Sequence, residues 1–422
     1  EAGGVRILGT SPDSFYVAVD RERFRKVLDA VGLKQPESGS ATRVEDAVLL
    51  ARRIGFPVLV RASYVLGGRA MEIVYDEAAI VRQFHEALDA SGGAPVLIDR
   101  FLEEAVEVDV DCLADGTDAV IGGIMEHIEE AGIHSGDSCC VIPSFSLTQE
   151  ILEEIRRGTY ALAKALKVRG LMNVQYAVRQ GQLYVLEVNP RASRTVPFVS
   201  KAIGVPLAKL AAKIMVGKTL KELGFTREVI PAHISVKEPV FPFSRFPGVD
   251  VLLGPEMRST GEVMGIDMDF GMAMAKAKLG AGQRLPLKGR VFVSLREADK
   301  PHAAAVARKF HALGFALVAT SGTARAILAA GVPVTPVKKI AEGRPNIHDM
   351  LLNGDIALVV NTPSGKDPRA DEAVIRRAAL TRQVPCITTV SGALAVTHGI
   401  GALQETGLRV PALQDFMSAA AK

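Results

Sequence analysis

The sequence predicts an α/β and α+β protein of more than one domain, and three observations lead to this prediction. The chain has 422 residues, which is more than one compact core usually holds. In its first half, strand-like and helix-like segments alternate, and several strands follow one another directly, which is typical of α+β architecture. After residues 283–289 the pattern becomes a regular repeat of strand and helix, which indicates a small second domain with a parallel sheet.

The first half contains strands with apolar runs or alternating polarity. The expected strands are residues 57–60, 70–75, 96–101, 106–113, 173–179 and 183–189. One helix is expected between a capping box at Thr42 and Glu45 and a stop at Gly55. Further helices are expected over 77–90 and from a second capping box at Ser146 and Gln149 to about residue 166.

The second half begins with an irregular segment over 218–285, in which Pro and Gly are scattered, and continues with a linker-like stretch over 283–289. Beyond it, the expected strands are 291–295, 315–320 and 356–361, and the expected helices are 301–313, 323–330 and 371–381. Short strands that alternate with helices favour a parallel sheet covered on both faces.

Composition argues against several classes of protein. The net charge of +3 is small and evenly spread, so nucleic acid is not an expected partner. The most apolar helix candidate, near 206–215, contains Lys209 and Lys213, so no membrane span is expected. The 4 cysteines lack metal-ligand spacing and are interpreted as reduced thiols, which favours a cytoplasmic location.

The sharpest candidate site is the run LYVLEVNPR at 183–191. On a strand, Glu187 and Asn189 lie on one face, and their oxygens suit Mg²⁺. Gln175 on the preceding strand lies opposite Glu187 if a three-residue loop joins the strands, whereas a two-residue turn places it opposite Leu186. Arg191 and Arg194 would follow, where a transferred phosphoryl group gathers charge. The alternative is a solvated Glu and Asn on an edge strand.

Three other polar segments are weaker candidates on their residues alone. Gly67 and Gly68 follow Arg61 in a loop that could close over phosphates, although an ordinary tight turn is the commoner explanation. The stretch 94–107 could present backbone groups to a planar base, or it could be a solvated acidic turn between two strands. The loop at 132–137 holds His134, for which a Zn site and a nucleophile pair both lack the required partners.

These segments together resemble the ATP-grasp superfamily and, more narrowly, the second synthetase half of the carbamoyl phosphate synthetase large subunit. The runs that carry the resemblance are RASYVLGGRAME (61–72), EVDVD (107–111), GGIMEHIE (122–129), HSGDS (134–138), RGLMNVQ (169–175), EVNPR (187–191), TVPFVSK (195–201) and LGPEMRSTGEVM (253–264). The resemblance covers essentially the whole chain.

The resemblance implies a ligase or phosphotransferase that uses ATP and Mg²⁺ or Mn²⁺, with K⁺ as a further cation, to phosphorylate carbamate to carbamoyl phosphate for pyrimidine and arginine biosynthesis. The implied nucleotide contacts are Arg21, Arg61, Gly67, Gly68, Arg100, Leu102, Glu107, Gly132, Ile133, His134, Ser135, Gln175 and Glu187. The implied metal ligands are Gln175, Glu187 and Asn189, and the implied catalytic residues are Arg191 and Glu187. Arg100 departs from the expected His.

The last part of the chain resembles a methylglyoxal-synthase-like effector module. Its run FALVATSGTA (315–324) places Thr320, Gly322 and Thr323 at the start of a helix, where anions bind. By the resemblance, Lys300, Lys339 and Asn361 complete an effector phosphate site, while Pro363 stands where a hydroxyl residue is expected. Glu129, Asp137 and Glu238 match an activator (ornithine) site. UMP, IMP and ornithine therefore remain open as effectors.

The resemblance also divides the chain and implies partners. Residues 1–24 would be a remnant of a preceding subdomain, 25–216 the ATP-grasp domain, 217–282 its extension and linker, and 283–422 the effector domain. The start at Glu1, without Met, suggests a fragment, so the amino-terminal synthetase half and a glutamine-hydrolysing small subunit would be partners in the intact enzyme. Two alternatives are a catalytically silent nucleotide-binding regulatory fragment and another ATP-grasp carboxylate–amine ligase.

Overall fold

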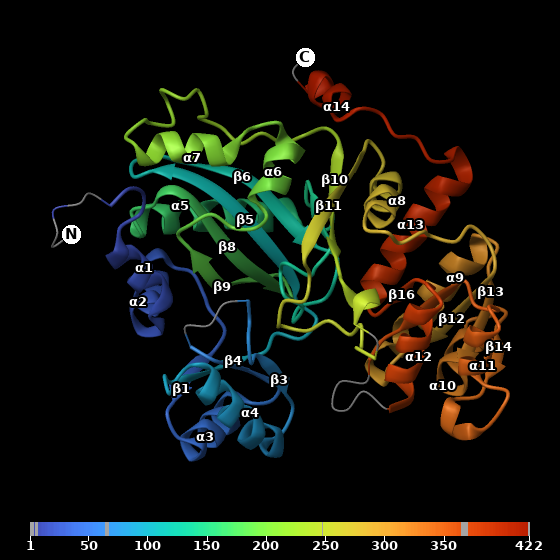
Figure 1. Ribbon diagram of the computed structural model, residues 1–422. Helices are drawn as coiled ribbons and strands as arrows, with labels where there is room; N and C mark the ends of the chain where they lie inside the picture. Colours follow the sequence, from blue (N-terminus) through green and yellow to red (C-terminus); the bar gives the residue numbers. More distant parts are fainter. Residues whose placement is uncertain (1–3, 5–6, 64–66, 247, 364–369, 421–422) are drawn as a thin grey trace. The chain divides into compact units, whose positions relative to one another are not determined.

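The computed structural model describes residues 4, 7–63, 67–246, 248–363 and 370–420. These residues form two compact units. Unit 1 comprises Glu1–Ile234, Gly254–Met257 and Gln414–Lys422, and unit 2 comprises Ser235–Leu253 and Arg258–Leu413. Each unit is described by itself below, with the element labels of Figure 1.

Unit 1 contains a small antiparallel sheet covered by two helices. The sheet has the order β1-β4-β2-β3, with β1 Ser38–Ala41, β2 Val58–Arg61, β3 Glu72–Val74 and β4 Val96–Arg100. The helices α3 (Val44–Ile54) and α4 (Glu77–Ala90) pack apolar side chains against Val58, Val60, Val96 and Ile98 of the sheet. The strand β2 ends at Arg61, as the sequence predicts, so this sheet delivers a guanidinium group to its edge.

The larger part of unit 1 is built on long antiparallel strands. They run in the order β7-β6-β5-β8-β9, with β5 Val106–Asp115, β6 Ala119–His127, β7 Cys140–Ile142, β8 Arg169–Arg179 and β9 Gln182–Asn189. The helices of this part are α1 (Pro12–Val19), α2 (Arg21–Val31), α5 (Gln149–Ala165), α6 (Val196–Ile203), α7 (Leu207–Met215) and α14 (Leu413–Ala420). Figure 1 shows the long strands with α5 and α7 beside them.

One face of these strands forms the main hydrophobic core. Val108, Val110, Val174 and Tyr176 point to the same face as the buried apolar side chains of α2 and α5. Because side chains alternate along a strand, Asp109, Asp111, Asn173 and Gln175 must lie on the opposite face. The alternation that the sequence shows along 106–113 therefore separates a core face from a polar face, although Asp109 and Asp111 are themselves buried.

Both predicted capping boxes are wrong in their residues. Helix α3 has Arg43 at its N-cap and no side-chain cap, because a guanidinium group has no acceptor for the helix amides, and Glu45 pairs with Arg43 at 3.3 Å. Helix α5 is capped by Thr148, whose hydroxyl accepts from the Ile151 N–H. Ser146 cannot cap this helix because its hydroxyl and its N–H both donate to the buried Glu126 carboxylate.

Unit 2 has a parallel sheet of 5 strands in the order β14-β13-β12-β15-β16, which confirms the predicted architecture. The strands are β12 Arg290–Ser294, β13 Ala316–Thr320, β14 Thr335–Val337, β15 Leu358–Asn361 and β16 Cys386–Ile387. Helices α9 (Ala303–Ala312), α10 (Ser321–Ala329) and α13 (Val390–Thr406) cover one face. Helices α11 (Ile347–Leu352) and α12 (Ala370–Thr381) cover the other.

The rest of unit 2 lies in the segment that the sequence left irregular. It contains β10 (Ile234–Val240), β11 (Gly261–Asp267) and α8 (Phe270–Gly280), which contacts α13. Short 3₁₀ helices occur at η1 Phe243–Arg245, η2 Glu297–His302 and η3 Ile340–Glu342. Within the described part of the chain, none of the helices combines the length and hydrophobicity that crossing a bilayer requires.

Candidate functional site

The hairpin of β8 and β9 settles the two registers that the sequence left open. Its turn has two residues, Gln180 and Gly181, since Arg179 pairs with Gln182, and both turn residues have positive φ (51° and 76°). Such a turn alone would place Gln175 opposite Leu186. A β-bulge between Gln175 and Tyr176 shifts the register by one residue, so that Gln175 lies opposite Glu187. Of the two alternatives, the pairing of Gln175 with Glu187 is therefore the one observed, but it occurs with the two-residue turn and not with the three-residue loop.

The polar faces of β5, β8 and β9 together present two cross-strand rows, which we call the polar array. In one row, Asp109 lies opposite Gln175, and Gln175 lies opposite Glu187. In the other, Asp111 lies opposite Asn173, and Asn173 lies opposite Asn189. Directly opposed residues of an antiparallel pair share a face, so the six side chains stand on one surface of the sheet.

The outer part of the polar array offers oxygen atoms suited to a hard cation. Asn189 Nδ2 donates to Glu187 Oε1 at 2.7 Å, and Gln175 Nε2 donates to Ser135 Oγ at 3.0 Å. Both amides thus use their NH₂ groups in these bonds, which leaves carbonyl oxygens beside the half-exposed Glu187 carboxylate. A carboxylate with amide oxygens matches the ligand preference of Mg²⁺, so the residues present fit this ion.

Two arginines stand next to the array and share the carboxylate of Asp99, and one of them also lies near Glu187. Arg21 Nη2 donates to Asp99 Oδ2, and Arg61 Nε lies 3.1 Å from the same oxygen. Arg61 Nη1 lies 3.9 Å from Glu187 Oε2. Burial, and to a smaller extent the neighbouring Arg61, lower the pKa of Arg21 although Asp99 acts in the opposite sense. With a cation bound to Glu187, the two guanidinium groups would have only the buried Asp99 carboxylate as a counter-charge, and this excess positive charge would attract an anion.

The glycine loop after β2 lies against another segment of unit 1. Gly67 O accepts from the Met257 N–H at 3.0 Å, and a Cβ on Gly68 would lie 2.3 Å from Pro255 O. Gly68 also has φ +69°, so both space and backbone conformation require glycine here. Tyr64, Val65 and Leu66, in the loop expected to close over phosphates, lie outside the described residues.

The loop at 132–138 meets the same segment and the predicted Glu107. Gly132 N–H donates to Glu107 Oε1 at 3.1 Å, and His134 N–H donates to Gly254 O at 2.9 Å. His134 Nδ1 accepts from the Gly136 N–H at 3.0 Å, and burial lowers the pKa of its ring. The structure thus brings Glu107 to Gly132, and Ser135 to Gln175. Ile133 lies between these two contacts.

In the stretch 94–107, predicted to present backbone groups to a planar base, some of the polar groups already have partners within the protein. The Arg100 N–H donates to Glu37 O at 2.7 Å, and its side chain donates to Ile54 O at 2.6 Å. Arg100 is thus committed to the small sheet and to α3 through both groups. Leu102 is buried and packs with Ala105 and Ala177.

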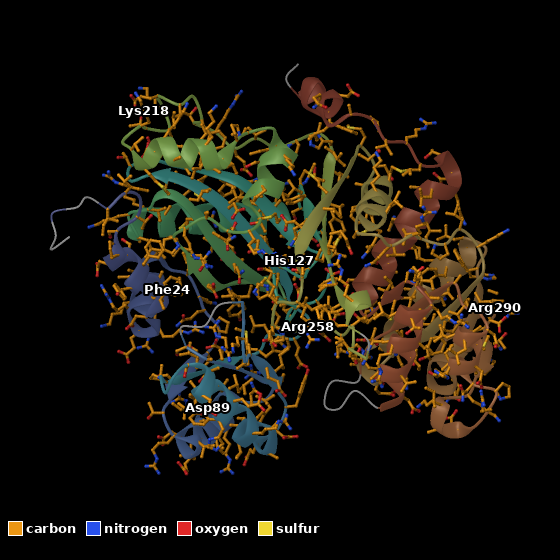
Figure 2. The ribbon with its side chains drawn as sticks, viewed as in Figure 1. Phe24, Asp89, His127, Lys218, Arg258 and Arg290 are labelled. Atoms are coloured by element: carbon orange, nitrogen blue, oxygen red, sulfur yellow. The ribbon has the colours of Figure 1, made fainter. Side chains whose placement is uncertain are left out.

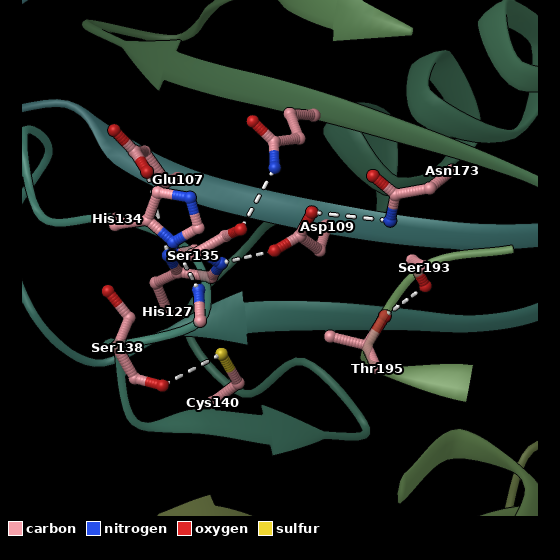
Figure 3. A network of polar contacts seen from close by, with 12 residues as sticks. Glu107, Asp109, His127, His134, Ser135, Ser138, Cys140, Asn173, Ser193 and Thr195 are labelled. Carbon is pink, nitrogen blue, oxygen red and sulfur yellow. Dashed lines mark hydrogen bonds and ion pairs between the residues drawn. The ribbon is translucent and has the colours of Figure 1, made fainter. Parts of the chain in front are cut away.

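A buried polar network next to the array was not predicted. His127 Nε2 lies 2.8 Å from Asp109 Oδ2, and His127 Nδ1 lies 3.6 Å from Glu107 Oε2 (Figure 3). Burial alone would lower the pKa of His127, but Cys140 and Asp109 raise it well above its ordinary value. Burial raises the pKa of Glu107 despite His127 and the Gly132 N–H. The regular spacing of the acidic residues Glu107, Asp109 and Asp111, together with His127 (labelled in Figure 2), is the signal that could have indicated this network.

A second part of this network surrounds Asp111. Its Oδ1 accepts from Asn173 Nδ2 at 3.0 Å and from Ser193 Oγ at 2.7 Å, and its Oδ2 accepts from Thr195 Oγ1 at 2.7 Å. Ser193 Oγ and Thr195 Oγ1 are themselves 2.6 Å apart (Figure 3). Two hydroxyl protons cannot fill three oxygen–oxygen contacts, so a proton on the carboxyl group would complete the ring. Burial raises the pKa of Asp111 to about 6.

The predicted Arg191 and Arg194 lie on the loop that follows β9. Both side chains are exposed; Arg191 Nη1 donates to Ala192 O at 3.0 Å, and Arg194 Nη1 contacts Met257 Sδ. Ser193 and Thr195 alternate with them and point inward to Asp111. The loop therefore turns two guanidinium groups outward and two hydroxyl groups inward.

The predicted effector residues of unit 2 mostly gather at the carboxyl ends of β12, β13 and β15. Ser294 Oγ lies 3.2 Å from Thr320 Oγ1, Asn361 Nδ2 donates to Ser294 O at 3.5 Å, and Thr323 Oγ1 accepts from the Leu295 N–H. A Cβ on Gly322 would lie 3.0 Å from Lys300 Nζ, so this ammonium group covers the start of α10. Strand order reverses at β12, which is where parallel sheets bind ligands.

Other residues at this end differ from the prediction. The Lys339 N–H donates to Glu342 after β14, and the lysine is not joined to the cluster by the contacts above. The fully buried Arg376 donates from Nη1 to Asn361 Oδ1 at 3.1 Å and pairs with Asp250 through Nε and Nη2. Sequence reasoning missed Ser294 and Arg376. Glu238, matched to an activator site, forms a buried ion pair with Lys278 at 2.7 Å, and its role as an activator contact stays a prediction.

Comparisons with known proteins agree with this geometry. Residues 20–223 match the family model "Carbamoyl-phosphate synthase L chain, ATP binding domain", and residues 302–388 match the "MGS-like domain". The carbamoyl phosphate synthase large chain, C-terminal section, of Aquifex aeolicus is 52% identical over 99% of this chain and 81% of that protein. The large chain of Archaeoglobus fulgidus is 56% identical, and this chain spans 39% of it. An arginine-specific chloroplastic large chain of Arabidopsis thaliana is 54% identical over 98% of this chain and 35% of that protein.

Solved structures show the fold of the first part. The biotin carboxylase domain of Hydrogenobacter thermophilus 2-oxoglutarate carboxylase, in complex with MgADP and bicarbonate, has a TM-score of 0.54 at 20% identity, over 65% of this chain and 67% of that one. Biotin carboxylase of Campylobacter jejuni also has a TM-score of 0.54, at 16% identity, over 66% and 69%. The ATP-grasp fold that the resemblance implied is therefore present, followed by an MGS-like domain. The chain belongs to the carbamoyl phosphate synthase large chain family, and it corresponds to the carboxyl-terminal section of that protein.

Proposed function

We propose that this chain phosphorylates carbamate with ATP to form carbamoyl phosphate, the second phosphorylation of carbamoyl phosphate synthesis. The observation that carries the proposal is the outer polar array with unbalanced arginines at its edge. Gln175, Glu187 and Asn189 offer hard oxygens. Arg21 and Arg61 both pair with Asp99, and Arg61 also lies 3.9 Å from Glu187, so their positive charge stands beside these oxygens. Phosphoryl transfer depends mainly on such positioning and charge neutralisation.

Each group has a distinct role in the proposed reaction. Gln175, Glu187 and Asn189 would hold Mg²⁺, or Mn²⁺ in its place, and the ion when bound would neutralise phosphate charge. Arg21 and Arg61 bind phosphate oxygens, because Asp99 cannot balance both of them. Arg191, exposed on the loop after β9, stabilises the negative charge that spreads over the transferred group. Carbamate is already a nucleophile, so the chain needs no general base and only has to align it.

Further contacts with the nucleotide are proposed for the glycine loop, the 132–135 loop and the backbone at residues 100–102. Gly67 and Gly68 would cover the phosphates, and the 132–135 loop with Glu107 would bound the sugar. Since Arg100 uses its N–H and its guanidinium elsewhere, its carbonyl and the backbone at Leu102 are the groups left for a base. We assign the phosphotransfer function to residues 25–216, with residues 217–282 as their extension and linker. We assign effector binding to residues 283–422.

The effector domain is proposed to bind a phosphorylated small molecule. Lys300, Thr320, Gly322 and Thr323 surround the amino terminus of α10, and Asn361 is tied to the same end of the sheet through Ser294. Helix amino termini and ammonium groups both attract phosphate. In the intact enzyme, we propose the amino-terminal synthetase half and a glutamine-hydrolysing subunit as partners, a cytoplasmic location, and roles in pyrimidine and arginine synthesis.

The reverse reaction tests the proposal with this chain alone. Purified protein is incubated with MgADP and carbamoyl phosphate, and ATP is measured by coupled luciferase or hexokinase. We expect carbamoyl phosphate-dependent ATP formation, and much less ATP with acetyl phosphate as the donor. Nucleotide binding without ATP formation would support the silent regulatory fragment, and equal use of acetyl phosphate would support a different carboxylate ligase.

A further inference from the structure

The loop over residues 190–195 joins the outer polar array to α6 and carries both exposed arginines. Its backbone is fixed at the start by the Arg191 N–H, which donates to Asn189 O at 2.7 Å. Its inward side chains are Ser193 and Thr195, and both end on the carboxyl group of Asp111. That group is almost fully buried, at 1% exposure, and comes from β5, two strands away from β9.

The bond from Thr195 is a tertiary contact rather than a helix cap. Thr195 occupies the N-cap position of α6, yet its side chain makes no capping bond to that helix. A threonine at this position usually accepts from the helix amides, which stabilises the helix by about 1 kcal/mol. Here the hydroxyl lies 2.7 Å from Asp111 Oδ2 instead. The local stabilisation of α6 is given up for a contact with the sheet.

Asp111 is also held rigidly on its own side. It faces Asn173 across the ladder, and Asn173 Nδ2 donates to its Oδ1 at 3.0 Å. On the other side, the ladder of β5 with β6 shifts register between Asp111 and Cys112. A bulge changes the direction of the side chains around it. One carboxyl group therefore connects β5, β8, the loop after β9 and the start of α6.

We propose that Asp111 is a positioning residue for phosphoryl transfer, which acts by holding Ser193 and Thr195 so that Arg191 meets the transferred group. This inference rests on the proposed function of the same site. Asp111 is buried beneath the loop, so it acts through Arg191 and not on the substrate. Displacement of a reacting group by about 1 Å can cost about a hundredfold in rate, so a loop with loosened inner contacts would lower kcat.

The first test removes single hydroxyl groups and compares them with a matched control. Thr195→Val and Ser193→Ala each remove one contact to Asp111. Thr159→Val is the control, because Thr159 is fully buried and its hydroxyl lies 2.9 Å from Tyr176 Oη on the core face. In the ATP-forming assay, we expect kcat to fall about 10- to 100-fold in the site variants with KM for ADP within about twofold. The control should keep its kcat. Equal losses in all three variants would overturn the proposal.

The second test asks whether the effect passes through Arg191. If Thr195 acts only by placing that arginine, Arg191→Ala and the double variant with Thr195→Val should have nearly the same kcat. Residues that act as a unit are non-additive in this way. If the double variant instead loses kcat by the product of the two single losses, the positioning role is contradicted. Thr195→Val would then act independently of Arg191, as a general loss of structure does.

A third measurement does not depend on catalysis. Hydrogen exchange of the amides at 191–196 should become faster in Thr195→Val and Ser193→Ala than in Thr159→Val, without any nucleotide. Unchanged protection of the loop would refute the role of Asp111 even if the protein were inactive. Conversely, absence of ATP formation by the unmodified chain would refute the proposed function, while the exchange data would still decide whether Asp111 holds the loop.

Discussion

The polar array of the antiparallel sheet and the proposed anion site of the parallel sheet are built in different ways. In the array, the side chains belong to residues of β5, β8 and β9, with Asn189 as the last residue of its strand, and their neighbours are set by register across these strands. In the parallel sheet, the polar groups stand at strand ends and at the start of α10. The first arrangement concentrates buried charge on a rigid surface, which suits chemistry. The second offers hydroxyl groups, a helix terminus and one covering lysine, which suits binding.

The difference also concerns how charges are balanced. Around Asp99, two guanidinium groups share one carboxylate, and next to Asp109 a buried histidine lies between two acids. At the parallel sheet, the buried Arg376 is fully paired with Asp250 and Asn361. Incomplete charge balance in the first region leaves a site that an anionic substrate can complete. Substitution of charged residues in this region should therefore lower catalysis more than substitutions at the parallel sheet.

The largest effect is expected at Glu187. Glu187→Gln keeps the shape of the side chain but removes the charge that would hold Mg²⁺, so ATP formation from carbamoyl phosphate should fall about a thousandfold. The unfolding temperature should stay close to that of the unmodified chain, because this side chain is half-exposed. Glu222→Gln, at a comparably exposed ion pair with Lys218, serves as the control and should keep full activity. A rate within tenfold of normal at saturating Mg²⁺ would remove Glu187 from the site.

The next effect concerns Asp99. Asp99→Asn leaves Arg21 and Arg61 facing each other with little compensation, which should lower the free energy of unfolding by about 3 to 4 kcal/mol. Pyrophosphate or ADP should restore more stability to this variant than to the unmodified chain, because the anion replaces the missing carboxylate. Thermal unfolding with and without these anions measures the difference. If these anions raise the unfolding temperature by the same amount in both proteins, the two arginines do not form an anion site.

A somewhat smaller effect is expected from the titration of Asp111. Burial raises its pKa to about 6 from the model-compound value of 3.8, so the folded state keeps a proton that the unfolded chain releases. Stability from this group is therefore fully present below about pH 4 and is lost as pH rises to about 6, an effect of about 2 to 3 kcal/mol. The free energy of unfolding, measured with urea, should therefore differ less between the unmodified chain and Asp111→Asn as the pH rises from about 4 to about 6.

Asp115, on the same strand, provides a control of opposite sign. Burial would raise its pKa, but hydrogen bonds from the N–H groups of Leu220, Asp118 and Thr117 outweigh burial and lower it. Its contribution should be present at neutral pH and disappear as pH falls through its lowered pKa. For each variant, the change in the free energy of unfolding relative to the unmodified chain is followed against pH. The same pH dependence in Asp111→Asn and Asp115→Asn would contradict the account of Asp111.

The smallest effect is expected in the effector domain. Lys300→Ala removes the ammonium group over Gly322, so phosphate, UMP or IMP should bind about tenfold more weakly to the full chain by calorimetry. Lys339→Ala should have less effect, since Lys339 is not joined to the cluster. ATP formation without effector should be unchanged in both. If Lys300→Ala leaves the affinity for phosphate, UMP and IMP unchanged, the effector binds elsewhere.

Sequence reasoning reached these two regions to different depths. The parallel sheet and the start of α10 could be predicted because a local pattern marks each of them, such as the Ser-Gly-Thr that begins α10, whereas Ser294 at the end of β12 was missed. Glu187 and Asn189 were placed on one face by their spacing of two. Their partner Gln175 depended on a bulge, which no spacing indicates. Asp111 was missed because its partners Ser193 and Thr195 come from a distant loop. The capping box at Ser146 failed because its hydroxyl is used in a tertiary contact with Glu126, and the box at Thr42 failed because Arg43 takes the N-cap position of α3.

The most direct test of the central claim is to locate the metal in crystals of the chain grown with ADP and Mn²⁺. The account predicts an anomalous difference peak within about 2.2 Å of oxygens from Gln175, Glu187 or Asn189, next to the ADP phosphates and within reach of Arg61. A peak bound by other residues, with ADP placed away from the polar array, would contradict it.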